Sequence, residues 1–448
     1  MKKYILGVCV WVTALFIAYP LHAQTNIHNL SLDEAIRYAK ESSPKQRISE
    51  MQLEQAKLKL QQSRISRIPD IYVSSDVRRN LIIPSTPVPA SAFNPNAPEG
   101  EQIYMKFNTD WNSSAGINLS YELFNPAKVG LINEQKQQLK ITEYDNQLSL
   151  KNLQSDVKMA YAECVIAQHQ LQSLTADTVY YAASLENSKD LYNKQKISLV
   201  EKNSAQTAFN QSLSRYMQGE KIRNDAASNL LYLMGLPVTM ENIENLHLSE
   251  DIASLYESML DSEDVSTNSA AVEELRQQEV VSLAENQVKF AKWKYVPSFS
   301  LNGFYGANYY SNELNLTKKD NWKGNSFIAL TMKLPLTQSL STSNEVSQLR
   351  MNQQIQSENL RDIQNTRNRA LFNQENLLQN RKREYVLSEE NMKISEQNLR
   401  AVEAQLSKGY ALEKDVLNAR LNVENARHNF MQAAYDIFQS LVAIEKLK

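Results

Sequence analysis

The sequence has little of the two residues that most often interrupt regular structure. Its 448 residues include only ten glycines and twelve prolines. Glycine relaxes the backbone and proline removes a hydrogen-bond donor, so both residues commonly mark turns. So few of them favour long, uninterrupted helices and strands.

The sequence also has little cysteine, its charges nearly balance, and its histidines are not clustered. The 48 basic and 50 acidic residues leave a net charge of −2, which gives no reason to expect a nucleic acid partner. The histidines lack the spacing of metal ligands, and no phosphate-binding loop or nucleophile motif is present. We therefore expect no enzyme, no cofactor and no metal site.

The N-terminal residues are typical of a secretory signal peptide. Two lysines precede an apolar run that ends near Tyr19, and a small residue follows at Ala23. We expect a signal peptide over 1–23. The remaining chain has one cysteine, Cys164, which excludes an internal disulfide and is expected to be a packed core thiol. No later apolar run approaches the ~20 residues of a membrane-spanning helix, whereas a barrel strand needs only ~9–11.

The rest of the chain contains two copies of one arrangement. Pro69 and Pro297 are 228 positions apart, and Ala205 and Ala419 are 214 apart, which indicates a tandem duplication. The first repeat covers 24–237, with a helix, two strands and two helices expected at 31–67, 70–80, 115–124, 126–192 and 198–234. After a connector at 238–266, in which a short helix near 252–260 is possible, the second repeat covers 267–448, with the same elements at 267–293, 297–307, 326–335, 341–406 and 412–447.

The longest helices carry apolar residues every seven positions. This period predicts a narrow seam for packing against another helix. Gly409 interrupts the pattern and predicts a sharp reversal at the tip of a helical hairpin. The seam of the second repeat contains Leu371, Leu378, Tyr385, Met392, Leu399 and Leu406.

The strands alternate apolar and polar residues, but four such strands cannot close a barrel alone. Open edges leave unpaired backbone groups, which lipid does not tolerate, so strands of other copies are expected to complete the barrel. The proline-rich residues 81–113 are expected to lack regular structure. Residues expected to face lipid are Ile71, Val73, Val77, Ile117, Leu119, Tyr121, Leu123, Phe299, Leu301, Tyr305, Ile328, Leu330 and Met332. Two aromatic groups are expected to form interfacial girdles: Tyr72, Phe124, Trp293, Tyr295 and Phe299, and Trp111, Tyr305, Tyr309, Tyr310 and Trp322.

The duplicated layout, the two prolines before the strands and the tip from Gly409 to Ala419 together resemble the TolC-like outer-membrane efflux and secretion factors. The resemblance implies a mainly α fold with a small β part. It further implies a homotrimer with a 12-stranded outer-membrane β-barrel that continues into a periplasmic α-helical coiled-coil barrel. The implied role is the exit duct of a tripartite efflux or type I secretion system in a Gram-negative bacterium. Its partners would be a periplasmic adaptor and an inner-membrane transporter.

The same resemblance assigns roles to residues near the two tips. Asp415 and Asn418 match the entrance constriction, where the family usually has two carboxylates. Alternatively, Asp415 only complements the dipole of the helix it begins. The expected adaptor-docking residues are Lys194, Gln195, Ile197 and Ser198 at the first tip, and Lys408, Gly409, Tyr410 and Leu412 at the second. Alternatively, both tips are ordinary exposed turns.

A second function from another class is a periplasmic coiled-coil adaptor or scaffold. It would account for the heptads. It would not account for two amphipathic hairpins, and the Gly-rich compact β domain expected of an adaptor is absent. The cargo is not readable from the sequence.

Overall fold

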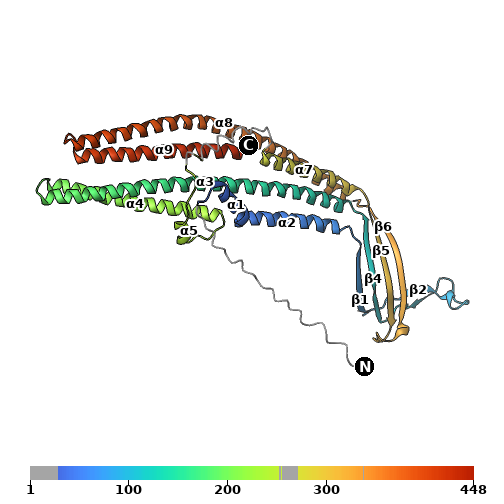
Figure 1. The fold of residues 1–448 in the computed structure, drawn as a ribbon. Helices are drawn as coiled ribbons and strands as arrows, with labels where there is room; N and C mark the ends of the chain where they lie inside the picture. Colours follow the sequence, from blue (N-terminus) through green and yellow to red (C-terminus); the bar gives the residue numbers. More distant parts are fainter. Residues whose placement is uncertain (1–28, 252–253, 255–270, 337) are drawn as a thin grey trace, which may run out of the picture. The chain divides into compact units, whose positions relative to one another are not determined.

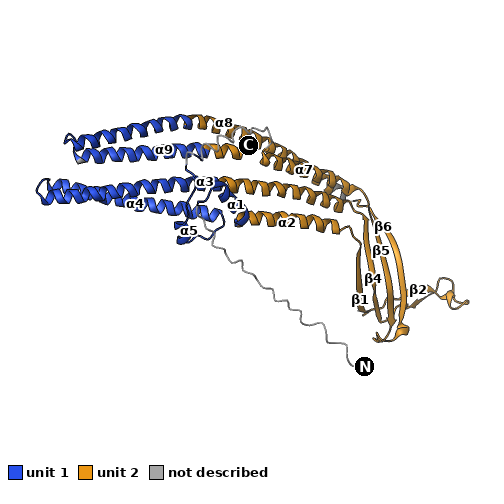
Figure 2. Ribbon diagram, in the orientation of Figure 1, with its two compact units in different colours: residues 1–43, 156–264, 381–439 blue, residues 44–155, 265–380, 440–448 orange. Residues whose placement is uncertain are grey.

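The computed structural model describes residues 29–251, 254, 271–336 and 338–448. The expected signal peptide therefore lies outside the described residues, and so does the possible helix near 252–260 except for residue 254. Figure 2 shows two compact units. Unit 1 comprises 1–43, 156–264 and 381–439, and unit 2 comprises 44–155, 265–380 and 440–448.

Unit 2 contains one antiparallel sheet of four strands, in the order β1-β4-β5-β6 (Figure 1). The strands are β1 (Asp70–Arg79), β4 (Trp111–Phe124), β5 (Ser298–Ser311) and β6 (Trp322–Lys333). Both predicted hairpins are confirmed. Three strands are longer than predicted, because backbone pairing continues through stretches such as Ser113–Ser114, where the apolar alternation has stopped.

The prediction that 81–113 lacks regular structure is wrong. Strands β2 (Thr86–Pro89) and β3 (Gln102–Met105) pair antiparallel as a separate two-stranded sheet. Both prolines of β2 lie in a strand with one partner, where a missing N–H group need not break the ladder. Proline content alone was therefore a poor guide to this segment.

The helices of unit 2 are α2 (Pro44–Ile65), α7 (Val272–Lys292), parts of the long helices α3 (Pro126–Asn193) and α8 (Gln338–Ser407), and the end of α9 (Glu413–Leu447). Helix α3 approaches α7 closely, since a Cβ atom at Gly130 would lie 3.0 Å from the Cβ of Phe290. Two hydrogen bonds join the same helices: Gln137 to Ser282 at 2.7 Å and Lys140 to Glu279 at 3.0 Å.

Unit 1 contains α1 (Leu32–Ser42), α4 (Leu199–Leu233), α5 (Met240–Glu244), most of α9 (Glu413–Leu447) and the tip-proximal parts of α3 and α8. The predicted single helix at 31–67 is wrong, because Ser43 is extended (φ −63°, ψ 127°) before Pro44. Proline disfavours helical backbone in the residue before it. The apolar pattern alone did not reveal this break.

The core of unit 1 is apolar, as the heptads predicted. Fully buried side chains include Tyr161, Cys164, Leu230 and Phe438. Burial raises the pKa of the Cys164 thiol to about 12, which fits the predicted packed thiol. Among the described residues, no helix carries an apolar stretch long enough to cross a membrane.

Candidate functional site

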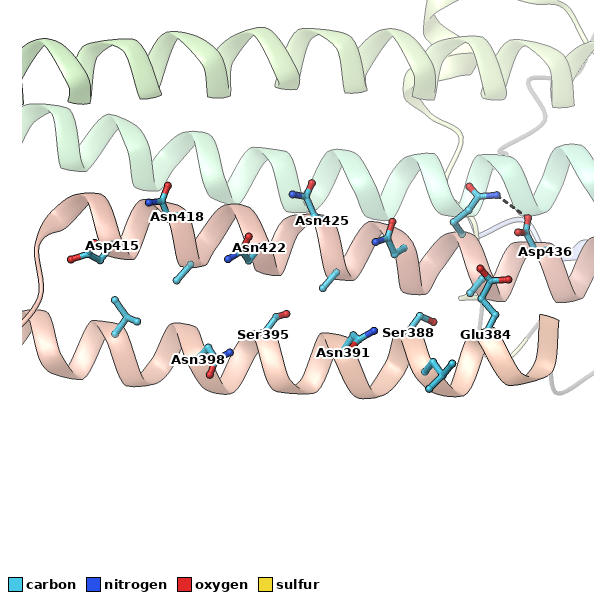
Figure 3. A pocket seen from close by; sticks show the side chains of 17 residues that line it. Glu384, Ser388, Asn391, Ser395, Asn398, Asp415, Asn418, Asn422, Asn425 and Asp436 are labelled. Atoms are coloured by element: carbon cyan, nitrogen blue, oxygen red, sulfur yellow. Dashed lines mark hydrogen bonds between the residues drawn. The ribbon is translucent and has the colours of Figure 1, made fainter. Parts of the chain in front are cut away.

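A groove of about 880 Å³ runs between α8 and α9 within unit 1 (Figure 3). Polar side chains spaced three and four residues apart line it from both helices. From α9 they are Asp415, Asn418, Asn422, Asn425, Asn429, Gln432 and Asp436. From α8 they are Glu384, Ser388, Asn391, Ser395 and Asn398.

This spacing places each set on one stripe of its helix. On α9 the neighbouring stripe is apolar and includes the buried Val416, Val423 and Ile437. The apolar stripe packs inside unit 1, while the amides remain exposed in the groove. This polar stripe was not predicted, because the prediction rested on the apolar heptads alone, although the regular asparagine spacing of α9 is a signal that the sequence contains.

The groove is lined mostly by neutral amides and hydroxyls, with carboxylates near its ends. Asp415 stands at the tip, whereas Glu384 and Asp436 stand at the far end (Figure 3). At about 1.5 Å rise per residue, the two ends of the α9 stripe are roughly 30 Å apart. Such a surface can exchange hydrogen bonds with many solutes and is acidic only near its ends.

Asp415 has two structural roles at the second tip. Its carboxylate lines the groove, and it also accepts a hydrogen bond from the backbone N–H of Leu412 at 2.9 Å. The second contact caps the first turn of α9. The groove interpretation and the helix-end interpretation are therefore both compatible with its position. Asn418 lines the groove one turn further along.

The two tips have the same backbone turn. At the first, Gln195 has φ 58°, and Lys196 donates to the carbonyl of Leu191 at 2.8 Å. At the second, Gly409 has φ 77°, and Tyr410 donates to the carbonyl of Gln405 at 2.8 Å. Gln195 thus adopts the left-handed conformation for which glycine is usual.

The predicted docking residues lie on these two turns. Ile197 is half-buried and the other seven side chains or glycine positions are exposed. Tyr410 exposes 82% of its surface and Leu412 58%, so the second tip presents more apolar surface than a solvated turn needs. Ser198 caps α4 and forms a reciprocal capping box with Glu201.

A charged cluster holds α9 against α3 and α4 in unit 1. Arg215 bonds to Glu424 at 2.7 Å, and Arg420 bonds to Glu403 at 2.8 Å while it stacks 3.5 Å above the Tyr180 ring. Burial raises the pKa of the nearby Asp177 carboxyl, and Arg420 partly offsets the effect. These contacts position the polar stripe of α9.

The residues predicted to face lipid share one face of the four-stranded sheet. Directly paired residues point to the same face, and side chains alternate along a strand. The pairings Ile71–Leu119, Ile117–Tyr305 and Leu301–Leu330 therefore connect the set across all four strands. Leu123 is the exception, since it lies in a bulge between Glu122 and Phe124. Val73 and Ile328 expose 79% and 78% of their surfaces.

The opposite face is mainly polar and corrects part of the girdle prediction. Tyr72 pairs with Asn118, and Tyr310 pairs with Asn112. Both tyrosines therefore lie on the polar face, so neither belongs to a girdle on the apolar one. The alternation of side chains along β1 already placed Tyr72 on the polar face, but the girdle prediction grouped aromatic residues by their distance from the strand ends.

Comparisons with known proteins agree with this fold. The Campylobacter jejuni CmeC outer membrane channel aligns at 17% identity with a TM-score of 0.71, covering 93% of this chain and 85% of that chain. The Vibrio cholerae outer membrane protein VceC aligns at 15% and 0.69, covering 93% and 95%. The Neisseria gonorrhoeae MtrE outer membrane channel, in its open state, aligns at 16% and 0.69, covering 93% and 88%. At these identities the likeness establishes the fold.

A search of curated proteins found no match. Among the described residues, no group of three or more histidine, cysteine, aspartate or glutamate side chains is placed to hold a metal ion. The family described as outer membrane efflux protein matches residues 35–236 and 266–448. The chain therefore belongs to the outer membrane efflux protein family, a family of channels and not of enzymes.

Proposed function

We propose that the protein is the exit duct of a tripartite efflux or type I secretion system, with three copies closing a 12-stranded barrel in the outer membrane. The observation that carries this proposal is the four-stranded sheet of unit 2. It has one exposed apolar face, one polar face and two outer strands, β1 and β6.

The apolar face needs a partner other than water. Fully burying an aliphatic side chain is favourable by about 1.5–3 kcal/mol relative to leaving it in water. On this face Val73, Ile328 and Leu330 are largely exposed. Lipid would cover such a face without any further protein. A soluble scaffold has no evident use for it.

The outer strands need partners as well. Within the part of the chain that the structure describes, β1 and β6 each pair with one neighbour. Unpaired backbone groups are not tolerated in lipid, and a closed ring of strands removes them. Pairing β6 of one copy with β1 of the next supplies that closure.

The remaining assignments follow from this barrel. The polar sheet face lines the pore, and the α8–α9 groove lines a periplasmic tunnel whose entrance is set by Asp415 and Asn418. The two tips dock a periplasmic adaptor that is bound to an inner-membrane transporter. The carboxylates of Asp415 from three copies would favour cations over anions.

The facing of the sheet can be tested with two adjacent residues of β4. Ile117→Lys places a charge on the apolar face, and Asn118→Lys places the same charge on the polar face. A lysine at the bilayer midplane costs about 2–4 kcal/mol on the lipid face of a barrel. We expect Ile117→Lys to abolish trimers in the outer-membrane fraction and Asn118→Lys to retain them.

Opposite results for the two variants would mean that the facing is inverted. Normal trimer yield from both would mean that the sheet does not cross the membrane, and would contradict the proposed function.

A further inference from the structure

On the polar face of the four-stranded sheet, one row of side chains is mainly aromatic. Tyr72, Asn118, Phe304 and Phe327 are paired in sequence across all four strands. Three of the four are aromatic. The adjacent row toward the helices contains Asp70, Ser120, Asn302 and Ala329, and the adjacent row toward the loops contains Ser74, Gly116, Gly306 and Asn325.

The two phenylalanines of this row form one surface. Their ring centroids are 6.1 Å apart, with the planes inclined by 25°. Phe304 also lies over two glycines of the next row, since a Cβ atom would fall 2.8 Å from its ring at Gly116 and 2.9 Å at Gly306. A side chain at either position would meet this ring and also the neighbouring backbone, at 2.7 Å from the carbonyl oxygen of Tyr305 for Gly116 and closer still to that of Ala115 for Gly306.

A structural role accounts for only part of this row. An aromatic ring that covers a strand glycine protects the backbone there, which explains Phe304. The side chains of Phe327 and Tyr72 are not among the atoms nearest to a glycine of the sheet, and these residues expose 52% and 47% of their surfaces. Apolar surface of this kind on a polar face commonly marks a binding site.

The neighbouring charge indicates what this surface would bind. Asp70 lies two residues from Tyr72 on the same face of β1, about 6.6 Å away along a strand. The other β1 carboxylate of this face, Asp76, already has Arg78 at 3.6 Å. Aromatic faces attract ammonium groups, and a carboxylate beside them strengthens the preference for a cation.

We propose that Tyr72, Phe304 and Phe327 form a binding site for organic cations in transit through the barrel. This inference rests on the proposed function, because it requires the polar face to line a pore. Three copies would bring three such rows into one lumen. The aromatic rings would bind the cation transiently, and Asp70 would favour positive charge.

The site can be tested with single channels in a planar lipid bilayer, using benzyltrimethylammonium as the probe added from the loop side. We expect reversible block of wild-type current. The half-blocking concentration should rise about two- to fivefold in Phe327→Ser and in Tyr72→Ser. Phe327→Tyr should retain the block. Asn325→Ser, on the same strand and face but one row away, is the matched control and should also retain it.

The variants avoid Phe304, whose removal would uncover two glycines and could prevent folding. Open channels that the probe does not block, or block that is equal in all variants, would overturn the aromatic site and leave the duct standing. If the wild-type protein forms no channel at all, the proposed function fails and this inference fails with it.

Discussion

The two helical tips are built from the same backbone and differ in their side chains. Gln195, Ser198 and Glu201 of the first tip correspond to Gly409, Leu412 and Asp415 of the second, each 214 positions later. Each turn has one left-handed residue, whose N–H donates to the carbonyl three residues earlier. In each turn the N–H of the next residue donates to the carbonyl five residues earlier. In each, an acidic side chain accepts from the backbone N–H that precedes the return helix, at 2.7 Å from Ser198 and 2.9 Å from Leu412.

The difference lies in how each tip is stabilised. The first tolerates a non-glycine residue at φ 58° and has a complete capping box. The second has the unstrained glycine but replaces the capping hydroxyl by the exposed Leu412. Each tip therefore has one favourable feature that the other lacks. A duplicated turn can keep its geometry while the residues that stabilise it change.

Exchanging the left-handed residues should give the largest effect. Gly409→Gln places a side chain in a conformation that costs roughly 1–2 kcal/mol for ordinary residues. We expect amide hydrogen exchange at the second tip to accelerate about 5- to 30-fold. Gln195→Gly should slow exchange at the first tip by less, because glycine also raises the entropy of the open state. Equal exchange rates in both variants and wild type would show that the left-handed turn does not limit tip stability.

Exchanging the capping residues should give a smaller effect. Ser198→Ala removes the hydroxyl that accepts from Glu201 N–H, at a cost of about 1 kcal/mol. Leu412→Ser supplies that hydroxyl to the second tip and should stabilise it by a similar or smaller amount. Hydrogen exchange of the first turns of α4 and α9 measures both. A Leu412→Ser variant that exchanges faster than wild type would mean that Leu412 packs at the tip in a way that outweighs the cap.

The two corresponding acidic residues, Asp415 and Glu201, should differ in their effect on ion selectivity. Asp415 lines the polar groove, whereas the corresponding Glu201 belongs to the other tip. We expect Asp415→Ala to lower the cation-to-anion permeability ratio about twofold in moderate salt, where exposed charges are partly screened. Glu201→Ala is the control and should leave the ratio unchanged. Unchanged selectivity in Asp415→Ala would show that this carboxylate does not set the ion selectivity of the entrance and has only its capping role.

The smallest expected effect is a pH dependence of the first tip. The backbone N–H of Ser198, followed by its hydroxyl, holds the pKa of Glu201 below its ordinary value of 4.5. A carboxyl with a lowered folded pKa stabilises the folded state above its unfolded pKa and loses that contribution as the pH falls through the folded value. Exchange at the start of α4, corrected for intrinsic rates, should therefore accelerate below about pH 4.5. In Glu201→Gln this extra acceleration should be absent.

The sequence predicted the long helices well because their signal is repeated many times. The first of them was expected at 126–192 and observed as Pro126–Asn193. Single residues caused the errors. Pro44 divides a helix whose apolar pattern continues across it, and β2 contains two prolines that a paired strand tolerates at the edge of its sheet. Such outcomes depend on tertiary context that periodicity does not contain.

The candidate site was predictable only in part. The apolar alternation correctly grouped residues such as Ile117 and Leu330 on one sheet face, because the period of a strand fixes which side chains share a face. The polar stripe of α9 and the row of Tyr72, Phe304 and Phe327 were missed. The α9 stripe lies on one helix and could have been read from its asparagine spacing, whereas the aromatic row becomes visible only when strand pairing brings separate segments together. The gating and docking roles remain predictions.

The most direct test of the proposed duct is conductance of the purified protein in a planar lipid bilayer, measured together with its mass in mild detergent. We predict discrete, cation-selective current steps from a particle with the mass of three chains. A water-soluble monomer without conductance would contradict the barrel and favour a periplasmic scaffold.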